Sequence, residues 1–167
     1  ERDQLDLFLK TKGYYYFSPD YLMAYADSTV GNRQVEIYLN LKKTTPEAAK
    51  YPYRINKITV FPNYSLVSDQ LDTSIIGAIK YDGLFIKDSA KKSNPRLFAQ
   101  TITYRPGRLY SSRSQNSTLN RLINLGAFKF VKNRFEALAD TGDLHRMNVY
   151  YYLTPAKKKS FQGEIDG

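Results

Sequence analysis

The sequence predicts an α+β fold in which a three-stranded mixed sheet carries two helices on one face. Two observations lead to this prediction. A helix–strand–strand pattern occurs twice along the chain. Strand-favouring aromatic residues are abundant, with fifteen Tyr and nine Phe among 167 residues. The composition, 42% hydrophobic and 25% charged, is that of a globular chain and argues against disorder.

Two glycines mark the repeat. Gly13 and Gly126 each follow a helical pattern, and each lies fourteen residues before an aspartate that opens a turn, Asp27 or Asp140. A strand of alternating apolar and polar residues comes after each turn, which indicates a half-buried strand. The predicted strands are 14–21 and 35–41 in the first copy, and 128–135 and 149–153 in the second.

The second copy is preceded by elements that the first copy lacks. Residues 56–61 alternate as a strand, and Ile55 is out of phase with them, which predicts either a β-bulge or a later start of the strand. Asn94 and Pro95 have the residue types of an N-cap and a first helical position, so a helix opens there and should end at Pro106-Gly107. Serines are candidate caps for the next helix: Ser111, Ser112 and Ser114.

These elements divide the chain into units. Residues 1–45 form a helix–strand–strand half unit, and residues 52–156 form a complete strand–helix–helix–strand–strand unit. We expect the chain to begin inside the first unit, and 157–167 to be a linker to a β-barrel beyond the sequence. An insertion at about 62–93 contains two apolar runs around Asp82-Gly83, which predicts a hairpin or flap.

Three motifs then resemble one family. Residues 53–60 (YRINKITV) look like an opening strand, 104–111 (YRPGRLYS) like a joint between two helices, and 122–131 (LINLGAFKFV) like a hinge from helix to strand. In this order and spacing they resemble the POTRA (polypeptide-transport-associated) domains of BamA/TamA-type outer-membrane β-barrel assembly factors, the surface antigen proteins of Gram-negative bacteria. The resemblance implies β-α-α-β-β modules.

It also implies a function without catalysis. The chain would be the periplasmic part of an outer-membrane protein that binds unfolded outer-membrane or secreted polypeptides and passes them to its own C-terminal barrel. Accessory periplasmic lipoproteins and the periplasmic surface of the outer membrane would be further partners. No cofactor is implied. Two alternatives remain: the transporter of a two-partner secretion system, and a periplasmic scaffold that takes no part in transport.

The implied mode of binding is β-augmentation, in which an extended chain joins a sheet edge. The predicted edge is 128–135, and replacing Lys129 or Lys132 by Pro should weaken capture. Phe128 and Phe130 are expected to be core side chains, so the backbone would carry the binding. The edge residues are Phe128, Lys129, Phe130, Val131, Lys132 and Arg134, and a second candidate edge comprises Tyr14, Tyr15, Tyr16 and Phe17.

Other chemistry has little support in the sequence. His145 is the only His and there is no Cys, so we expect no metal site. Asp82, Asp140 and Asp143 fall in turns, without the spacing of a catalytic pair, and we expect no catalytic residue. The net charge of +9 suits an acidic partner, but no nucleic-acid motif accompanies it, so nucleic acid is not expected to bind. A basic run that could meet anionic headgroups comprises Lys157, Lys158 and Lys159.

Overall fold

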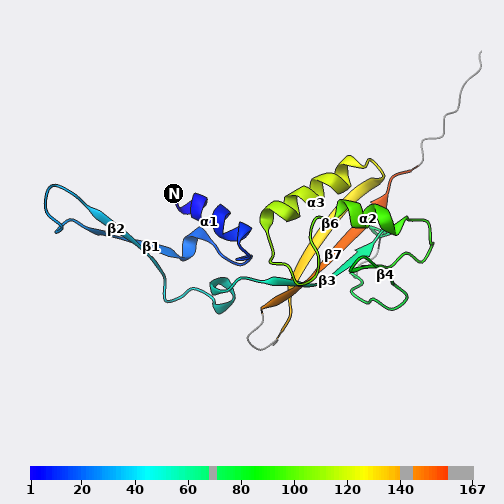
Figure 1. The fold of residues 1–167 in the computed structure, drawn as a ribbon, viewed down its shortest axis with the longest axis horizontal. Coiled ribbons are helices and arrows are strands. Elements are labelled where there is room, and N and C mark those ends of the chain that lie inside the picture. The colour runs from blue at the N-terminus through cyan, green and yellow to red at the C-terminus, as the bar shows by residue number, and fades with distance from the viewer. Residues whose placement is uncertain (68–70, 140–144, 158–167) are drawn as a thin grey trace, which may run out of the picture.

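The computed structural model describes residues 1–67, 71–139 and 145–157, and it confirms the α+β class. The first 45 residues contain helix α1 (Arg2–Thr11), the short 3-10 turn η1 (Pro19–Tyr21) and an antiparallel pair of strands, β1 (Leu22–Asp27) and β2 (Glu36–Leu41). A second 3-10 turn, η2 (Glu47–Lys50), precedes the larger unit. Figure 1 shows the β1–β2 hairpin projecting from one end of the molecule.

The larger unit is built on a five-stranded mixed sheet with the order β4-β5-β3-β7-β6. Strand β3 (Arg54–Phe61) runs parallel to β7 (Arg146–Pro155), and β6 (Phe128–Ala137) is antiparallel to β7. These three strands are the ones that the sequence predicts. The insertion adds the hairpin β4 (Ile79–Tyr81) and β5 (Leu84–Ile86), with β5 parallel to β3, so the prediction of a three-stranded sheet is wrong by two strands.

Local features of β3 and the hairpin follow the sequence closely. The register of β3 against β7 shifts between Ile55 and Lys57, so the first of the two alternatives, a bulge, is confirmed, and the strand does not start later. Asp82 and Gly83 turn the β4–β5 hairpin with φ values of 47° and 80°. A two-residue turn with two positive φ angles matches the twist of the strands that it joins, and Asp-Gly is a favoured pair for it.

Two helices cover one face of this sheet. Helix α2 (Pro95–Thr101) is capped by the Asn94 side chain, whose Oδ1 accepts a hydrogen bond of 3.0 Å from the Arg96 amide. It ends before Pro106-Gly107, because Ile102 is already extended. Helix α3 (Ser112–Asn124) begins after Ser111, so Ser111 occupies the predicted N-cap position. Its hydroxyl, however, makes no capping hydrogen bond.

The main core lies between these helices and the sheet. Phe98 from α2 and Leu122 from α3 pack onto buried side chains of β3, β7 and β5, and partly buried side chains of β6 pack against this cluster. Strand β7 is buried on its other face too, because Tyr150 and Tyr152 pack with Phe61 under the first part of the insertion. The side chains that are fully buried include Ile58, Val60, Leu84, Met147, Val149, Tyr151 and Leu153.

The first unit differs most from the prediction. Residues 14–17 form no strand, because the chain turns after α1 and Ser18 caps η1 by accepting from the Asp20 amide. The strand of that copy is β1, further along. Strand β2 was expected to be half-buried, yet all six of its residues are exposed, since no described element covers either of its faces.

Candidate functional site

Strand β6 forms one edge of the five-stranded sheet, as the sequence predicts. It pairs with β7 on one side, and on its other side no described strand lies beside it. An edge of this kind offers backbone N–H and C=O groups to an incoming extended chain. At ten residues, β6 is one of the two longest strands of the described chain.

The backbone groups that point outward from β6 can be assigned by alternation. The Leu138 amide donates to the Arg146 carbonyl oxygen at 2.9 Å, and these residues lie opposite each other in the β6–β7 register. Opposite pairs in an antiparallel ladder alternate between bonded and non-bonded. Arg134 and Lys132 therefore bond to β7, whereas the groups that face the open side belong to Val131, Asn133, Phe135 and Ala137.

This assignment corrects the choice of Lys132 as a test position. The Lys132 amide lies in the ladder with Tyr152, so Pro at this position would break a bond inside the sheet. Lys129 lies in the irregularity between Phe128 and Phe130, where the register against β7 shifts. Of the predicted edge residues, Val131 is the one within the regular ladder whose amide faces outward.

Side chains of β6 divide between its two faces. Phe128, Val131 and Phe135 pack against the main core. Phe130 is 44% exposed, so the prediction that it is a core residue is wrong, while the same prediction for Phe128 is confirmed. The Lys129 Nζ lies 5.4 Å from the centroid of the Phe130 ring, a cation–π contact.

The exposed face of β6 carries positive charge. Lys132 is exposed, and Arg134 lies two residues further along the same face. The Arg134 guanidinium is 3.5 Å from the Glu136 carboxylate, which neutralises one of the two charges. The exposed Lys129 and Lys132 keep the open edge soluble and disfavour pairing between two copies of the chain.

The opposite margin of the three predicted strands is closed. Strand β5 occupies the free side of β3 and contributes Leu84 and Ile86 to the main core. The turn of its hairpin is held from the helical side, because the Arg105 Nη2 donates to the Asp82 carboxylate at 2.7 Å and to the Ala99 carbonyl oxygen at 2.6 Å. An extended chain therefore has access to β6 and not to β3.

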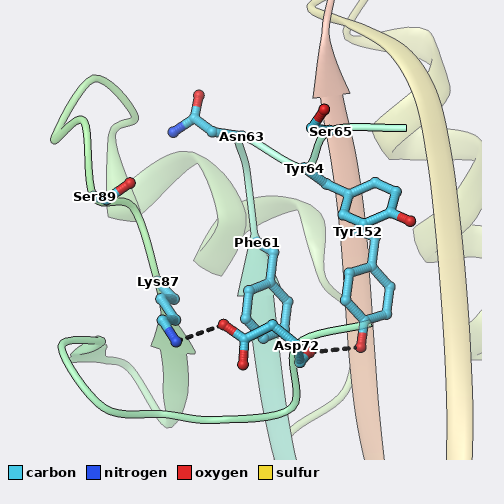
Figure 2. Close-up of a pocket in the computed structure, with 8 residues that line it drawn as sticks. All are labelled: Phe61, Asn63, Tyr64, Ser65, Asp72, Lys87, Ser89 and Tyr152. Atoms are coloured by element: carbon cyan, nitrogen blue, oxygen red, sulfur yellow. Dashed lines mark hydrogen bonds and ion pairs between the residues drawn. The ribbon is translucent and has the colours of Figure 1, made fainter. Parts of the chain in front are cut away.

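The insertion also covers the sheet face that lies away from the helices, a feature that the sequence did not reveal. Figure 2 shows Tyr64 and Asp72 lying over Phe61 and Tyr152. The Phe61 and Tyr152 rings are stacked at 5.0 Å, and the Tyr152 hydroxyl donates to the Asp72 carbonyl oxygen at 2.8 Å. A cavity of 210 Å³ remains between them and Lys87.

The polar groups that line this cavity already have partners within the chain. The Asp72 carboxylate pairs with the Lys87 ammonium, and this hydrogen bond lowers the pKa of Asp72. Burial raises the pKa of Tyr152 to about 12. Neither group is placed for proton transfer near neutral pH, and the arrangement serves to fasten the insertion to the sheet.

The second candidate edge is not an edge. Tyr15 and Tyr16 turn toward the larger unit, where Tyr15 lies 4.9 Å from the Tyr110 ring centroid and 5.6 Å from that of Phe135. Tyr16 lies 5.3 Å from Tyr53 in the same manner. Aromatic contacts between the two units, which local patterns cannot show, hold this segment outside any strand.

The other residues considered from the sequence have structural roles or lie outside the described chain. His145 stacks on Tyr51 at 4.2 Å, and Asp82 pairs with Arg105. No group of three or more His, Asp or Glu residues that could hold a metal is found in 1–67, 71–139 and 145–157. Lys157 is exposed. The residues outside the described ranges are Asp140, Asp143, Lys158 and Lys159.

No helix among the described residues has both the length and the apolar character that a bilayer span requires.

Comparison with solved structures identifies the fold. The alignment with BamA from Haemophilus ducreyi lacking POTRA domains 1–3 covers 93% of this chain and 22% of the BamA chain, with a TM-score of 0.55 and 13% sequence identity. POTRA3–5 of Haemophilus influenzae BamA match 92% of this chain and 45% of their own (TM-score 0.47, 16% identity). The alignment with POTRA1–3 of the periplasmic domain of Omp85 from Anabaena covers 93% of this chain and 49% of the Omp85 chain (TM-score 0.45, 15% sequence identity).

The chain therefore has a POTRA-like fold, as its motifs suggested, and it spans about a fifth of the length of the Haemophilus ducreyi protein. No protein-family model matches the sequence, and no curated protein matches it. The likeness concerns the fold and leaves the substrate open.

Proposed function

We propose that this chain is the periplasmic POTRA region of an outer-membrane β-barrel assembly protein, and that it binds unfolded outer-membrane polypeptides at β6 by β-augmentation before they reach the barrel. The open margin of β6 carries the proposal. Its outward amides and carbonyls recur every second residue from Val131 to Ala137, the spacing at which an extended chain presents its own groups.

The rest of the unit favours β6 as the docking edge, because the other edge strand of the five-stranded sheet, β4, is only three residues long. Strand β5 closes the β3 side, so a substrate strand would be directed to β6. Main-chain bonding depends little on side-chain identity, which suits a protein that handles many substrates. The POTRA-like fold supports this function by analogy of fold, and the proposed binding requires no cofactor or catalytic group.

Asn133 offers a direct test, because Pro and Ala at this position differ in the backbone amide. Asn133→Pro removes an outward N–H, whereas Asn133→Ala keeps it and removes the same side chain. One lost hydrogen bond is worth about 0.5–1.5 kcal/mol, so Asn133→Pro should bind an extended peptide roughly 2- to 10-fold more weakly than Asn133→Ala. Fluorescence anisotropy of a labelled peptide of about ten residues, the length of a barrel strand, measures this.

Both variants must first show the circular dichroism spectrum and cooperative unfolding of the parent chain. If folded Asn133→Pro binds the peptide as tightly as Asn133→Ala, capture does not use the β6 margin. Binding to neither the parent chain nor the variants would reject the proposed function as a whole.

A further inference from the structure

The two faces of β6 differ in their chemistry. Val131 and Phe135 pack against the main core and therefore lie on the helical face of the sheet, and both are only partly buried. Lys132 and Arg134 alternate with them and lie on the other face, where their partners on β7 are the two tyrosines beneath the insertion. The margin of β6 is therefore apolar on one face and basic on the other.

The basic face of β6 keeps a net positive charge. Lys132 is exposed, and no ion pair within residues 1–67, 71–139 and 145–157 includes it. The Arg134 side chain is 39% exposed, and its guanidinium lies 3.5 Å from the carboxylate of Glu136, the one acidic residue of β6. Since two cations stand beside one carboxylate, this face attracts negative charge at its margin.

A strand added at β6 would meet the two faces at alternate residues. The outward amides belong to Val131, Asn133 and Phe135, so partner residues opposite these form hydrogen-bonded pairs and share the helical face. In an antiparallel arrangement, partner residues opposite Lys132 and Arg134 form non-hydrogen-bonded pairs, whose Cα atoms are about 4.5 Å apart. These are the closer pairs of such a ladder, so partner side chains at both positions would contact the two cations directly.

We propose that β6 selects extended segments in which acidic residues alternate with apolar ones, and that Lys132 and Arg134 determine the acidic preference. This inference rests on the proposed function and names the class of segment that the same margin prefers. Opposite charges across a ladder stabilise the pairing of two strands, and like charges destabilise it. Apolar partner residues on the helical face extend the main core beside Val131 and Phe135. The backbone thus supplies affinity, and the alternate side chains supply specificity.

Two labelled peptides of about ten residues and equal composition test the alternation. One carries Glu-Val-Glu at its centre, so both carboxylates lie on one face of the added strand. The other carries the same residues in the order Glu-Glu-Val, so the carboxylates lie on opposite faces. Both peptides have the same net charge, so their attraction to the basic chain as a whole is equal. Fluorescence anisotropy at low salt should show the Glu-Val-Glu peptide binding about 2- to 10-fold more tightly.

Charge removal assigns the preference to particular residues. Lys132→Gln/Arg134→Gln should lose the preference for the Glu-Val-Glu peptide over a Gln-Val-Gln peptide, and raised salt should weaken that preference in the parent chain. Lys12→Gln/Lys43→Gln is the matched control, because it removes the same charge at exposed lysines of the first unit and should keep the preference. Circular dichroism checks that both double variants are folded.

Equal affinities of the parent chain for the Glu-Val-Glu and Glu-Glu-Val peptides would overturn the proposed selection, and this comparison does not depend on the folding of any variant. Equal losses of preference in the two double variants would mean attraction by net charge alone and would refute the role of Lys132 and Arg134. In both cases the peptides still bind, so capture at β6 would stand. Binding of none of the peptides would overturn the selection and the proposed function together.

Discussion

Gly13 joins the two units through its backbone. Its φ of 105° lies in the region that favours glycine, and a Cβ placed on it would lie 2.9 Å from the Pro52 Cβ. Its carbonyl oxygen accepts a hydrogen bond of 2.9 Å from the Tyr53 amide. Gly126 holds the same place in the repeat, with a φ of 65°, but has open space around it. The repeat predicts both glycines, and only Gly13 also serves as a contact between units.

We therefore expect Gly13→Ala to destabilise the chain more than Gly126→Ala does. Strain at a positive φ costs about 1–3 kcal/mol at either position, and Gly13→Ala adds the clash with Pro52. Urea-induced unfolding, followed by circular dichroism, compares the two variants. Equal losses would show that the units can separate slightly at no cost and that the close approach contributes nothing.

At the scale of elements, the hairpin of β4 and β5 is part of the core as well as a cover for β3. Leu84 on β5 is fully buried, whereas Ile79 on β4 is 52% exposed. The insertion is therefore folded into the sheet along β5 and meets solvent along β4.

Leu84→Ala should accordingly lower the free energy of unfolding by about 2–5 kcal/mol, the usual cost of such a truncation in a core. Ile79→Ala serves as the control and should cost less than about 1 kcal/mol, because its side chain is largely solvated. Thermal unfolding of both variants checks this. A small effect of Leu84→Ala would mean that the insertion is a detachable flap.

Sequence could predict the elements whose signals are local. The cap at Asn94, the bulge after Ile55, the turn at Asp82-Gly83 and the stops at Gly13 and Gly126 each depend on a few adjacent residues. The end of α2 was predicted too late, because the chain is already extended at Ile102, before Pro106. The position of the β6 edge followed from the resemblance. Contacts between distant segments were missed, such as the packing of Tyr15 on Phe135, because strand-like composition also describes an aromatic loop that packs on another unit.

Tyrosines link the whole molecule. Tyr110 from the loop before α3 contacts Tyr15 of the first unit and donates from its hydroxyl to the Gln115 Oε1 at 2.6 Å. Tyr152 joins the insertion to β7. Burial raises the pKa of each from the ordinary value of 10.0 to about 12. Both rings are therefore neutral in the folded chain well above the pH at which they ionise in an unfolded one.

Stability should consequently fall in alkali. Below about pH 10 the folded and unfolded chains both hold these two protons, and between about pH 10 and pH 12 only the folded chain does, so the free energy of unfolding decreases as the pH rises. Urea unfolding at a series of pH values, with tyrosinate absorbance, measures the decrease. Tyr152→Phe should be less stable than the parent chain at neutral pH, and its free energy of unfolding should decrease less steeply between about pH 10 and pH 12. A flat stability profile would contradict the assignment.

The unequal sides of the sheet have a consequence for self-association. A fibril grows by strand stacking only if every chain that adds to it presents another open strand edge, to which the next chain can pair. Here the side opposite β6 ends in β4, which is three residues long. Two copies that met through β6 would leave only these short strands as the outer edges of the joined five-stranded sheets, so this sheet could not grow beyond a pair.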